Sequence, residues 1–194
     1  TQPGTYIDTL QTISGCDSLI YTDITIYSQF NSIFGGIANN TIGGGAYFSN
    51  STQHLELSCY IGSELVSAVV YSQDTSINTF EIRDNAGNIL DDTTVTVIPG
   101  GHRIYFNYQM TGGMDYELGI SGLPDGLFRN NSGVNYPYNF ASAAAITSSS
   151  AGGNYYYFFY DIEVRVSGSA ALTTNYTICD DDSITVAGNT YNTT

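Results

Sequence analysis

The chain has 194 residues, enough for one sizeable domain with a smaller appendage. It carries 18 acidic side chains against four arginines and no lysine, giving a formal net charge of −14. That balance excludes the basic surface that nucleic acids and anionic membranes require. Only 11% of the residues are charged, and a surface made mainly of Ser, Thr, Asn, Gly and Tyr favours a secreted or cell-surface protein. No apolar run is long enough for a membrane-spanning helix.

Hydrophobic and polar side chains alternate along most of the chain, which is the pattern of half-buried β-strands. Gly-rich turns separate the strands, so the sequence predicts an all-β fold: a central antiparallel β-sandwich of the jelly-roll or immunoglobulin-like kind. Asp84–Asn88 predicts a hairpin turn, and the helix-like composition of 141–146 is too short for a stable helix. The predicted strands, in chain order, are residues 5–13, 19–27, 54–61, 79–84, 94–100, 102–110, 116–121 and 155–166.

Composition divides the chain into four segments. Residues 1–27 form a strand pair, and residues 29–167 form the sandwich. The small residues of 168–175 indicate a linker. Residues 176–194 have the pattern of half of a small β-module: a strand, a turn and the beginning of a second strand.

Three cysteines occur at spacings that match no zinc site. Cys59 is in phase with the apolar residues Leu55 and Leu57, which predicts a buried strand position. Cys16 and Cys179 lie near opposite ends of the chain, each beside an Asp-rich turn. This placement suggests a disulfide, within one chain or between two units.

The two end segments, written with the C-terminal one first, read as one continuous β-module. This joined string resembles a short repeat of giant secreted and surface proteins of Bacteroidota, although Asp181 stands where that repeat usually has Gly. The matching residues are Ile178, Cys179, Asp182, Ser183, Ile184, Val186, Gly188 and Tyr191, followed by Gly4, Tyr6, Asp8, Thr9, Leu10, Gly15, Cys16, Asp17 and Ser18.

The central region resembles a β-sandwich module found in the same type IX-secreted proteins, on segments 79–90, 115–122, 127–138 and 154–164. Both resemblances imply an extracellular or cell-surface location. The end segments also resemble an O-glycan acceptor motif of these proteins, Asp-Ser/Thr followed by an aliphatic residue, which implies O-glycosylation at Thr9, Ser18 and Ser183.

A module divided between the two ends of a chain can be completed in two ways. If the ends meet, the chain closes on itself; otherwise residues 176–194 of one unit pair with residues 1–27 of the next. Exposed strand edges favour pairing, and a head-to-tail contact that does not close produces a filament. We expect head-to-tail completion, with Cys16 and Cys179 forming an inter-unit disulfide.

Motifs for catalysis are missing: neither His54 nor His102 lies beside a nucleophile motif, and there is no phosphate-binding loop. A glycosidase pair among the scattered glutamates is a minor alternative. We expect no metal site and no cofactor. A structural calcium ion at Asp91–Asp92 or Asp180–Asp182 remains an alternative.

The sequence is rich in tyrosine, with 17 residues, and contains no tryptophan. Tyrosine rings with nearby amides and a guanidinium are suited to binding sugars, although these side chains pack the core in most sandwiches. The candidate ligand-binding residues are Arg129, Asn130, Asn131, Tyr136, Tyr138, Tyr155 and Tyr157.

These observations predict a non-enzymatic repeat subunit of an extracellular filament or long surface adhesin, assembled head-to-tail by strand complementation. Its main partner would be another copy of itself, with glycans as possible ligands and no nucleic acid or membrane insertion. The alternative is a carbohydrate-binding accessory module of a secreted enzyme.

Overall fold

A computed structural model describes residues 4–11, 17–26, 31–166, 170–177, 183–186 and 189–192. These residues form strands and connecting turns, without helix, and two antiparallel sheets pack as a β-sandwich. The predicted all-β sandwich is therefore confirmed. The chain divides into two compact units, one of residues 30–167 and the other of residues 1–29 and 168–194.

The sandwich unit begins with β3 (Asn31–Gly35) and ends with β15 (Tyr160–Val166), which pair with each other along their length. Its first layer is a six-stranded sheet with the order β12-β13-β5-β10-β7-β8. The strands of this layer are β5 (His54–Cys59), β7 (Ser76–Asp84), β8 (Ile89–Val97), β10 (Met114–Ile120), β12 (Tyr138–Phe140) and β13 (Ala144–Ser149).

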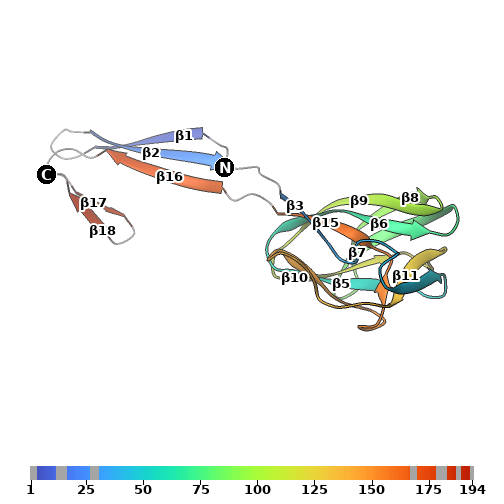
Figure 1. Ribbon diagram of the computed structural model, residues 1–194. Helices are drawn as coiled ribbons and strands as arrows, with labels where there is room; N and C mark the ends of the chain where they lie inside the picture. The colour runs from blue at the N-terminus through green and yellow to red at the C-terminus, as the bar shows by residue number, and fades with distance from the viewer. Residues whose placement is uncertain are drawn as a thin grey trace. The chain divides into compact units, whose positions relative to one another are not determined.

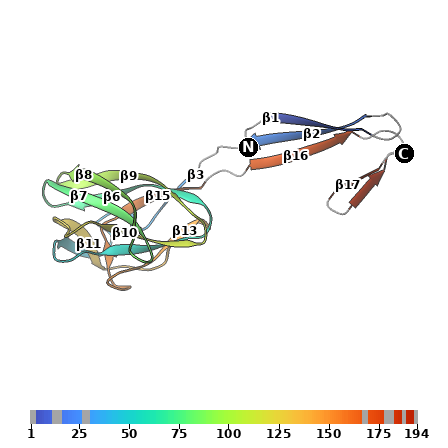
Figure 2. The ribbon, with the colours of Figure 1, turned by 180° about the vertical axis from the view of Figure 1, so that it is seen from behind.

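The second layer is a seven-stranded sheet with the order β14-β11-β6-β15-β3, in which β4 also pairs with β11 and β9 with β6. Figures 1 and 2 show the two layers from opposite sides. The remaining strands of this layer are β4 (Gly44–Phe48), β6 (Ser63–Ser72), β9 (Gly100–Met110), β11 (Leu127–Ser132) and β14 (Tyr156–Tyr157).

The core lies between the layers and consists of alternate apolar side chains from each strand. Leu118 and Phe80 of one sheet are fully buried, as is Phe159 in the connection between β14 and β15, and the rings of Phe80 and Phe159 pack edge to face at 5.8 Å. Cys59 is 1% exposed, which confirms its predicted burial. Burial of this apolar surface is the main source of the sandwich's stability.

The predicted hairpin turn at Asp84–Asn88 joins β7 to β8. The Asp84 carboxylate accepts hydrogen bonds from the backbone N–H of Ala86 and of Asn88. A hydrogen bond from the Asn88 side chain is the largest cause that lowers the pKa of Asp84. Gly87 adopts a φ of 83°, a conformation that favours glycine.

The segment predicted as one strand over 155–166 is interrupted. Phe158 has a φ of 67°, and the backbone N–H of Phe159 bonds the carbonyl of Tyr157 at 2.9 Å, which separates β14 from β15. As a result residues 156–160 are all buried, whereas a regular strand would place alternate residues on opposite faces. Packing of the aromatic run therefore overrides the alternation in the sequence.

The second unit contains a three-stranded antiparallel sheet with the order β1-β2-β16 and a separate two-stranded sheet, β17-β18. Strand β2 lies between β1 and β16 (Figure 1), so both ends of the chain contribute to one sheet. Strand β16 covers most of the segment predicted as a linker. The strands are β1 (Gly4–Gln11), β2 (Asp17–Ile26), β16 (Ala170–Thr177), β17 (Ser183–Val186) and β18 (Asn189–Asn192).

Candidate functional site

The most unusual polar group of the sandwich is the guanidinium of Arg129, on strand β11. In the ladder Arg129 lies opposite Ala46 of β4 on one side and Tyr157 of β14 on the other. Directly opposed residues point to the same face of a sheet, so the three side chains form a row across three strands. The guanidinium carbon lies 5.0 Å from the ring centre of Phe48, 4.9 Å from that of Tyr155 and 6.0 Å from that of Tyr157.

Aromatic rings therefore surround this cation, and the faces of such rings attract a positive charge electrostatically. We call the group of Arg129, Phe48, Tyr155 and Tyr157 the Arg129 cluster. Burial raises the pKa of Tyr157, and the nearby Arg129 charge partly offsets this increase. The Nε and Nη1 atoms of Arg129 are buried and have no hydrogen-bond partner within the described part of the chain.

The other three arginines each have a carboxylate partner. Arg83 pairs with Glu81, Arg103 pairs with Asp161, and Arg165 lies 3.2 Å from Glu64 and 3.6 Å from Glu163. Arg129 has no carboxylate within 4.0 Å among the residues that the structure describes. In a chain with 18 acidic side chains, this isolation is notable because buried charge without a partner is costly.

Asn130, the neighbour of Arg129 in sequence, is used inside the fold. It is fully buried, its side-chain Nδ2 donates to the Ile42 carbonyl at 2.7 Å, and its Oδ1 accepts from the Tyr160 hydroxyl at 2.7 Å. The amide therefore has no free edge for a ligand. Asn131, next along β11, is exposed.

Tyr136 and Tyr138 belong to a second aromatic group. Their rings meet edge to face at 5.4 Å, and both contact Tyr156. The Tyr136 hydroxyl donates to the Tyr155 carbonyl at 2.8 Å, and burial raises the pKa of Tyr136. The Tyr138 hydroxyl accepts from the Asn135 N–H at 2.8 Å. Of the predicted ligand face, the structure brings Arg129, Tyr155 and Tyr157 together and uses Asn130, Tyr136 and Tyr138 in internal contacts.

Phe48 belongs to the Arg129 cluster and was not among the sequence candidates. Its strand, β4, lies within the Gly-rich stretch 43–48, where Gly45 approaches the backbone of β11 so closely that an added Cβ would lie 2.2 Å from the Arg129 carbonyl. The glycines thus mark a close strand pairing. The Gly-rich stretches were predicted as turns, whereas Gly44 and Gly45 lie inside β4; a glycine within a strand marks a close approach of two backbones, but the sequence does not identify the opposite strand.

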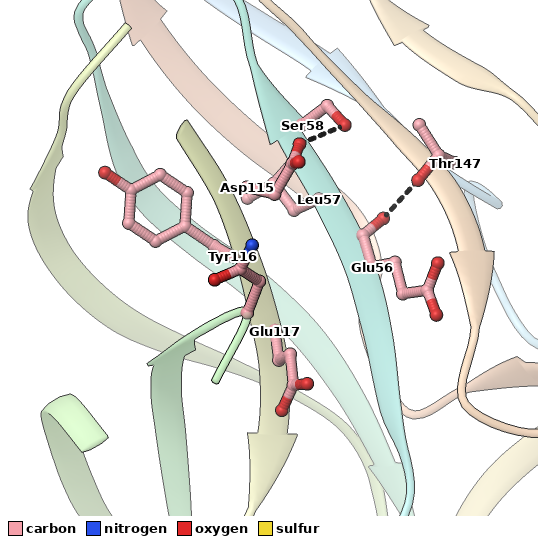
Figure 3. A pocket seen from close by; sticks show the side chains of 8 residues that line it. Glu56, Leu57, Ser58, Asp115, Tyr116, Glu117 and Thr147 are labelled. Atoms are coloured by element: carbon pink, nitrogen blue, oxygen red, sulfur yellow. Dashed lines mark hydrogen bonds between the residues drawn. The ribbon is translucent and has the colours of Figure 1, made fainter. Parts of the chain in front are cut away.

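A hollow of about 250 Å³ opens on the six-stranded sheet (Figure 3). Glu56 and Glu117 lie directly opposite each other on β5 and β10, Ser58 donates to Asp115 at 2.7 Å, and His54 lies 3.5 Å from Glu117. Adjacent carboxylates repel each other. The lining residues are Glu56, Leu57, Ser58, Asn85, Asp115, Tyr116, Glu117 and Thr147.

This hollow contains two of the five glutamates considered as a glycosidase pair, whereas the other three, Glu64, Glu81 and Glu163, are ion-paired with arginines. The described residues include no group of three His, Cys, Asp or Glu side chains able to hold a metal ion. Asp91 and Asp92 are exposed on β8, at the edge of the sheet.

Several predicted positions fall outside the described residues. These include both cysteines of the expected disulfide, Cys16 and Cys179, and the turn Asp180–Asp182. Thr9, Ser18 and Ser183 lie in strands β1, β2 and β17, and their side chains are not part of the description. Cys59 carries a free, buried thiol.

Comparison with known proteins identifies no relative. No family model matches the sequence, no curated protein matches it, and no solved structure matches the fold. In the part of the chain that the structure describes, no helix has the length and hydrophobicity needed to cross a membrane.

Proposed function

We propose that this protein is a structural repeat subunit of an extracellular filament or long surface adhesin, whose units join by β-strand pairing between their small terminal units. The observation that carries the proposal is the two-stranded sheet β17-β18. Within the described residues these two strands pair only with each other, over four positions from Ser183↔Asn192 to Val186↔Asn189.

An isolated two-stranded hairpin is marginally stable in water, and three or more strands are needed for independent stability. The β17-β18 sheet would therefore gain most from a third strand. A sheet edge presents a row of backbone donors and acceptors that pairs readily with another strand. Pairing of the hairpin with an outer strand of the next unit's three-stranded sheet supplies that third strand.

The residues proposed to make the inter-unit contact differ in one respect from those predicted from the sequence. Strand β16 pairs with β2 of the same chain over eight positions, from Ala170↔Ile26 to Thr177↔Leu19. The region expected to pair with a neighbouring unit begins at residue 176 in the sequence prediction, so its first two residues are used within the chain. In this proposal the inter-unit contact is made by residues 183–192.

Composition supports an extracellular structural role. The surface has few charges and a strong acidic balance, and acidic repulsion keeps densely arranged copies soluble. The resemblance of the end segments to a repeat of secreted surface proteins belongs to the same proposal, as do an inter-unit disulfide of Cys16 with Cys179 and glycans on Thr9, Ser18 and Ser183. No catalytic role is proposed.

The test is a proline substitution in the hairpin. Thr185→Pro removes a backbone N–H from β17, and Thr185→Ser is the matched control that keeps it. Sedimentation velocity over a wide concentration range and electron microscopy should show concentration-dependent rods for the native chain and for Thr185→Ser, and monomers for Thr185→Pro. Monomers for the native chain, or equal assembly of all three, would refute the proposal.

The alternative of a carbohydrate-binding module retains one specific observation. Asn130, Tyr136 and Tyr138 make internal hydrogen bonds, so a broad tyrosine and amide face is not supported. What remains of that candidate face is the Arg129 cluster and the exposed Asn131.

A further inference from the structure

Arg129 differs from every other arginine of the chain in its surroundings. All four arginines lie within residues 31–166, and three of them are ion-paired with Asp or Glu. Arg129 instead contacts three aromatic rings and keeps two buried nitrogen donors without a partner in the described structure. A charge held in this way lacks the compensation that a carboxylate provides.

We propose that the Arg129 cluster is a binding site for the carboxylate of an acidic sugar, such as a uronate residue of a glycan. Guanidinium groups bind carboxylates through short, charge-assisted hydrogen bonds. The ring faces of Phe48 and Tyr155 hold the guanidinium at 5.0 and 4.9 Å, so the side chain is ordered before the ligand arrives. This preorganisation reduces the entropy that binding costs.

The ligand reaches the guanidinium from the side of β4. Ala46 lies directly opposite Arg129 and is exposed, so the smallest chiral side chain occupies the position beside the cation. On the other side of the row, Tyr157 is 3% exposed and closes the site. Because Nε and Nη1 are buried, the carboxylate is expected to accept a hydrogen bond from Nη2, and it compensates the charge of the guanidinium without pairing the two buried donors.

An acidic sugar fits this site better than a free anion does. Phe48 and Tyr155 are only half-buried, so their rings extend an apolar surface beside the cation. Sugar rings carry C–H-rich faces that pack on aromatic rings, and binding sites for small molecules combine such surfaces with a few well-placed polar groups. A carboxylate attached to a sugar ring uses both features. This inference does not depend on the assembly of the units.

The test uses the full chain and two probes of equal length, polygalacturonate oligosaccharides and their methyl esters, with binding measured by calorimetry. The ester keeps every sugar ring and removes the charge. Arg129→Gln removes the guanidinium, and Arg165→Gln is the matched control because it makes the same change in charge at an arginine that is paired with Glu64. Ala46→Leu covers the site without altering Arg129.

The native chain and Arg165→Gln should bind the acid form and bind its ester about tenfold or more weakly, as expected for the loss of a charge-assisted hydrogen bond. Arg129→Gln and Ala46→Leu should each bind the acid form about tenfold or more weakly than the native chain does. If Arg129→Gln does not fold, the affinity of Ala46→Leu for the acid form tests the proposal instead. Equal binding of acid and ester, no binding by the native chain, or unchanged binding by Ala46→Leu would overturn the assignment. If Arg129→Gln changes self-association but not sugar binding, the carboxylate belongs to a second copy and the proposal is wrong.

Discussion

The pairing of β2 with β16 within one chain can be tested by an engineered disulfide. Thr22 lies opposite Thr174, and Asp23 lies opposite Thr173. In an antiparallel ladder, adjacent pairs alternate between hydrogen-bonded and non-hydrogen-bonded types, and the side chains are closer in the second type. Since a disulfide needs Cβ atoms about 3.5–4.5 Å apart, one of the two double-cysteine variants should oxidise readily and the other poorly.

The gain in stability follows from the loop that the bond closes. The ends of the sandwich unit are held together by the ladder, where Asn31 lies opposite Val166. If the sandwich stays folded while the terminal unit unfolds, the flexible loop runs from residue 22 to 30 and from 167 to 174, about 15 residues, and the expected gain is about 3 kcal/mol. If both units unfold together, the closed loop is about 150 residues and the expected gain is about 5 kcal/mol.

The assay combines non-reducing electrophoresis with thermal unfolding, in a background of Cys16→Ser and Cys179→Ser so that only the new thiols and the buried Cys59 remain. Oxidation should give a monomer of increased mobility, and the unfolding transition of the terminal unit should rise and return on reduction. Disulfide-linked dimers and longer ladders from both variants would refute in-chain pairing and would mean that β16 pairs with β2 of another copy.

Four further substitutions, one of them a matched control, test the sandwich by chemical unfolding. Ala141 is exposed with a φ of 47°, so Ala141→Gly should stabilise the fold by roughly 0.5–1 kcal/mol, while Ala86→Gly, at an exposed turn position without a positive φ, should destabilise it; shifts in the same direction would contradict this reasoning. Leu118→Ala, at a fully buried site, should cost about 3 kcal/mol, and a loss below about 1 kcal/mol would mean that the core collapses around the gap. Burial alone would raise the pKa of Glu163, but hydrogen bonds from two serines and two nearby arginines have the larger combined effect, so the pKa in the folded protein lies below its ordinary value of 4.5. The ionised carboxylate therefore contributes stability above pH 4.5, and this contribution is lost as the pH falls through the folded pKa. Glu163→Gln should therefore reduce stability at pH 7 and flatten the acid loss, and an unchanged acid profile would count against this role.

The sequence predicted several strands that have one face toward solvent, although it missed the exposed strands β3 and β4. Of the segment predicted over 54–61, residues 54–59 form β5, and residues 102–110 form most of β9. Strand β6 escaped prediction because it is central: residues 63–72 are buried on both faces along much of their length, so the sequence SELVSAVVYS shows no regular alternation. Strand β16 was missed for another reason. Its first residues are small and match a linker by composition, and only pairing with β2 makes them a strand.

The Arg129 cluster shows why residue type alone could not define the site. Arg129 and Asn130 are adjacent in sequence and were grouped as one polar face, yet neighbours in a strand point to opposite sides of the sheet. Asn130 is consequently buried against Tyr160, while Arg129 lies among the rings of Phe48 and Tyr155. The proposal depends on one difference: aromatic rings contact the guanidinium of Arg129, whereas carboxylates pair with the other three arginines. That difference depends on the register of β4 and β14 against β11, which a local pattern does not contain. A slip of β4 by one residue would move Phe48 to the opposite face and leave the guanidinium with one ring fewer, so the register itself is the determinant of this site.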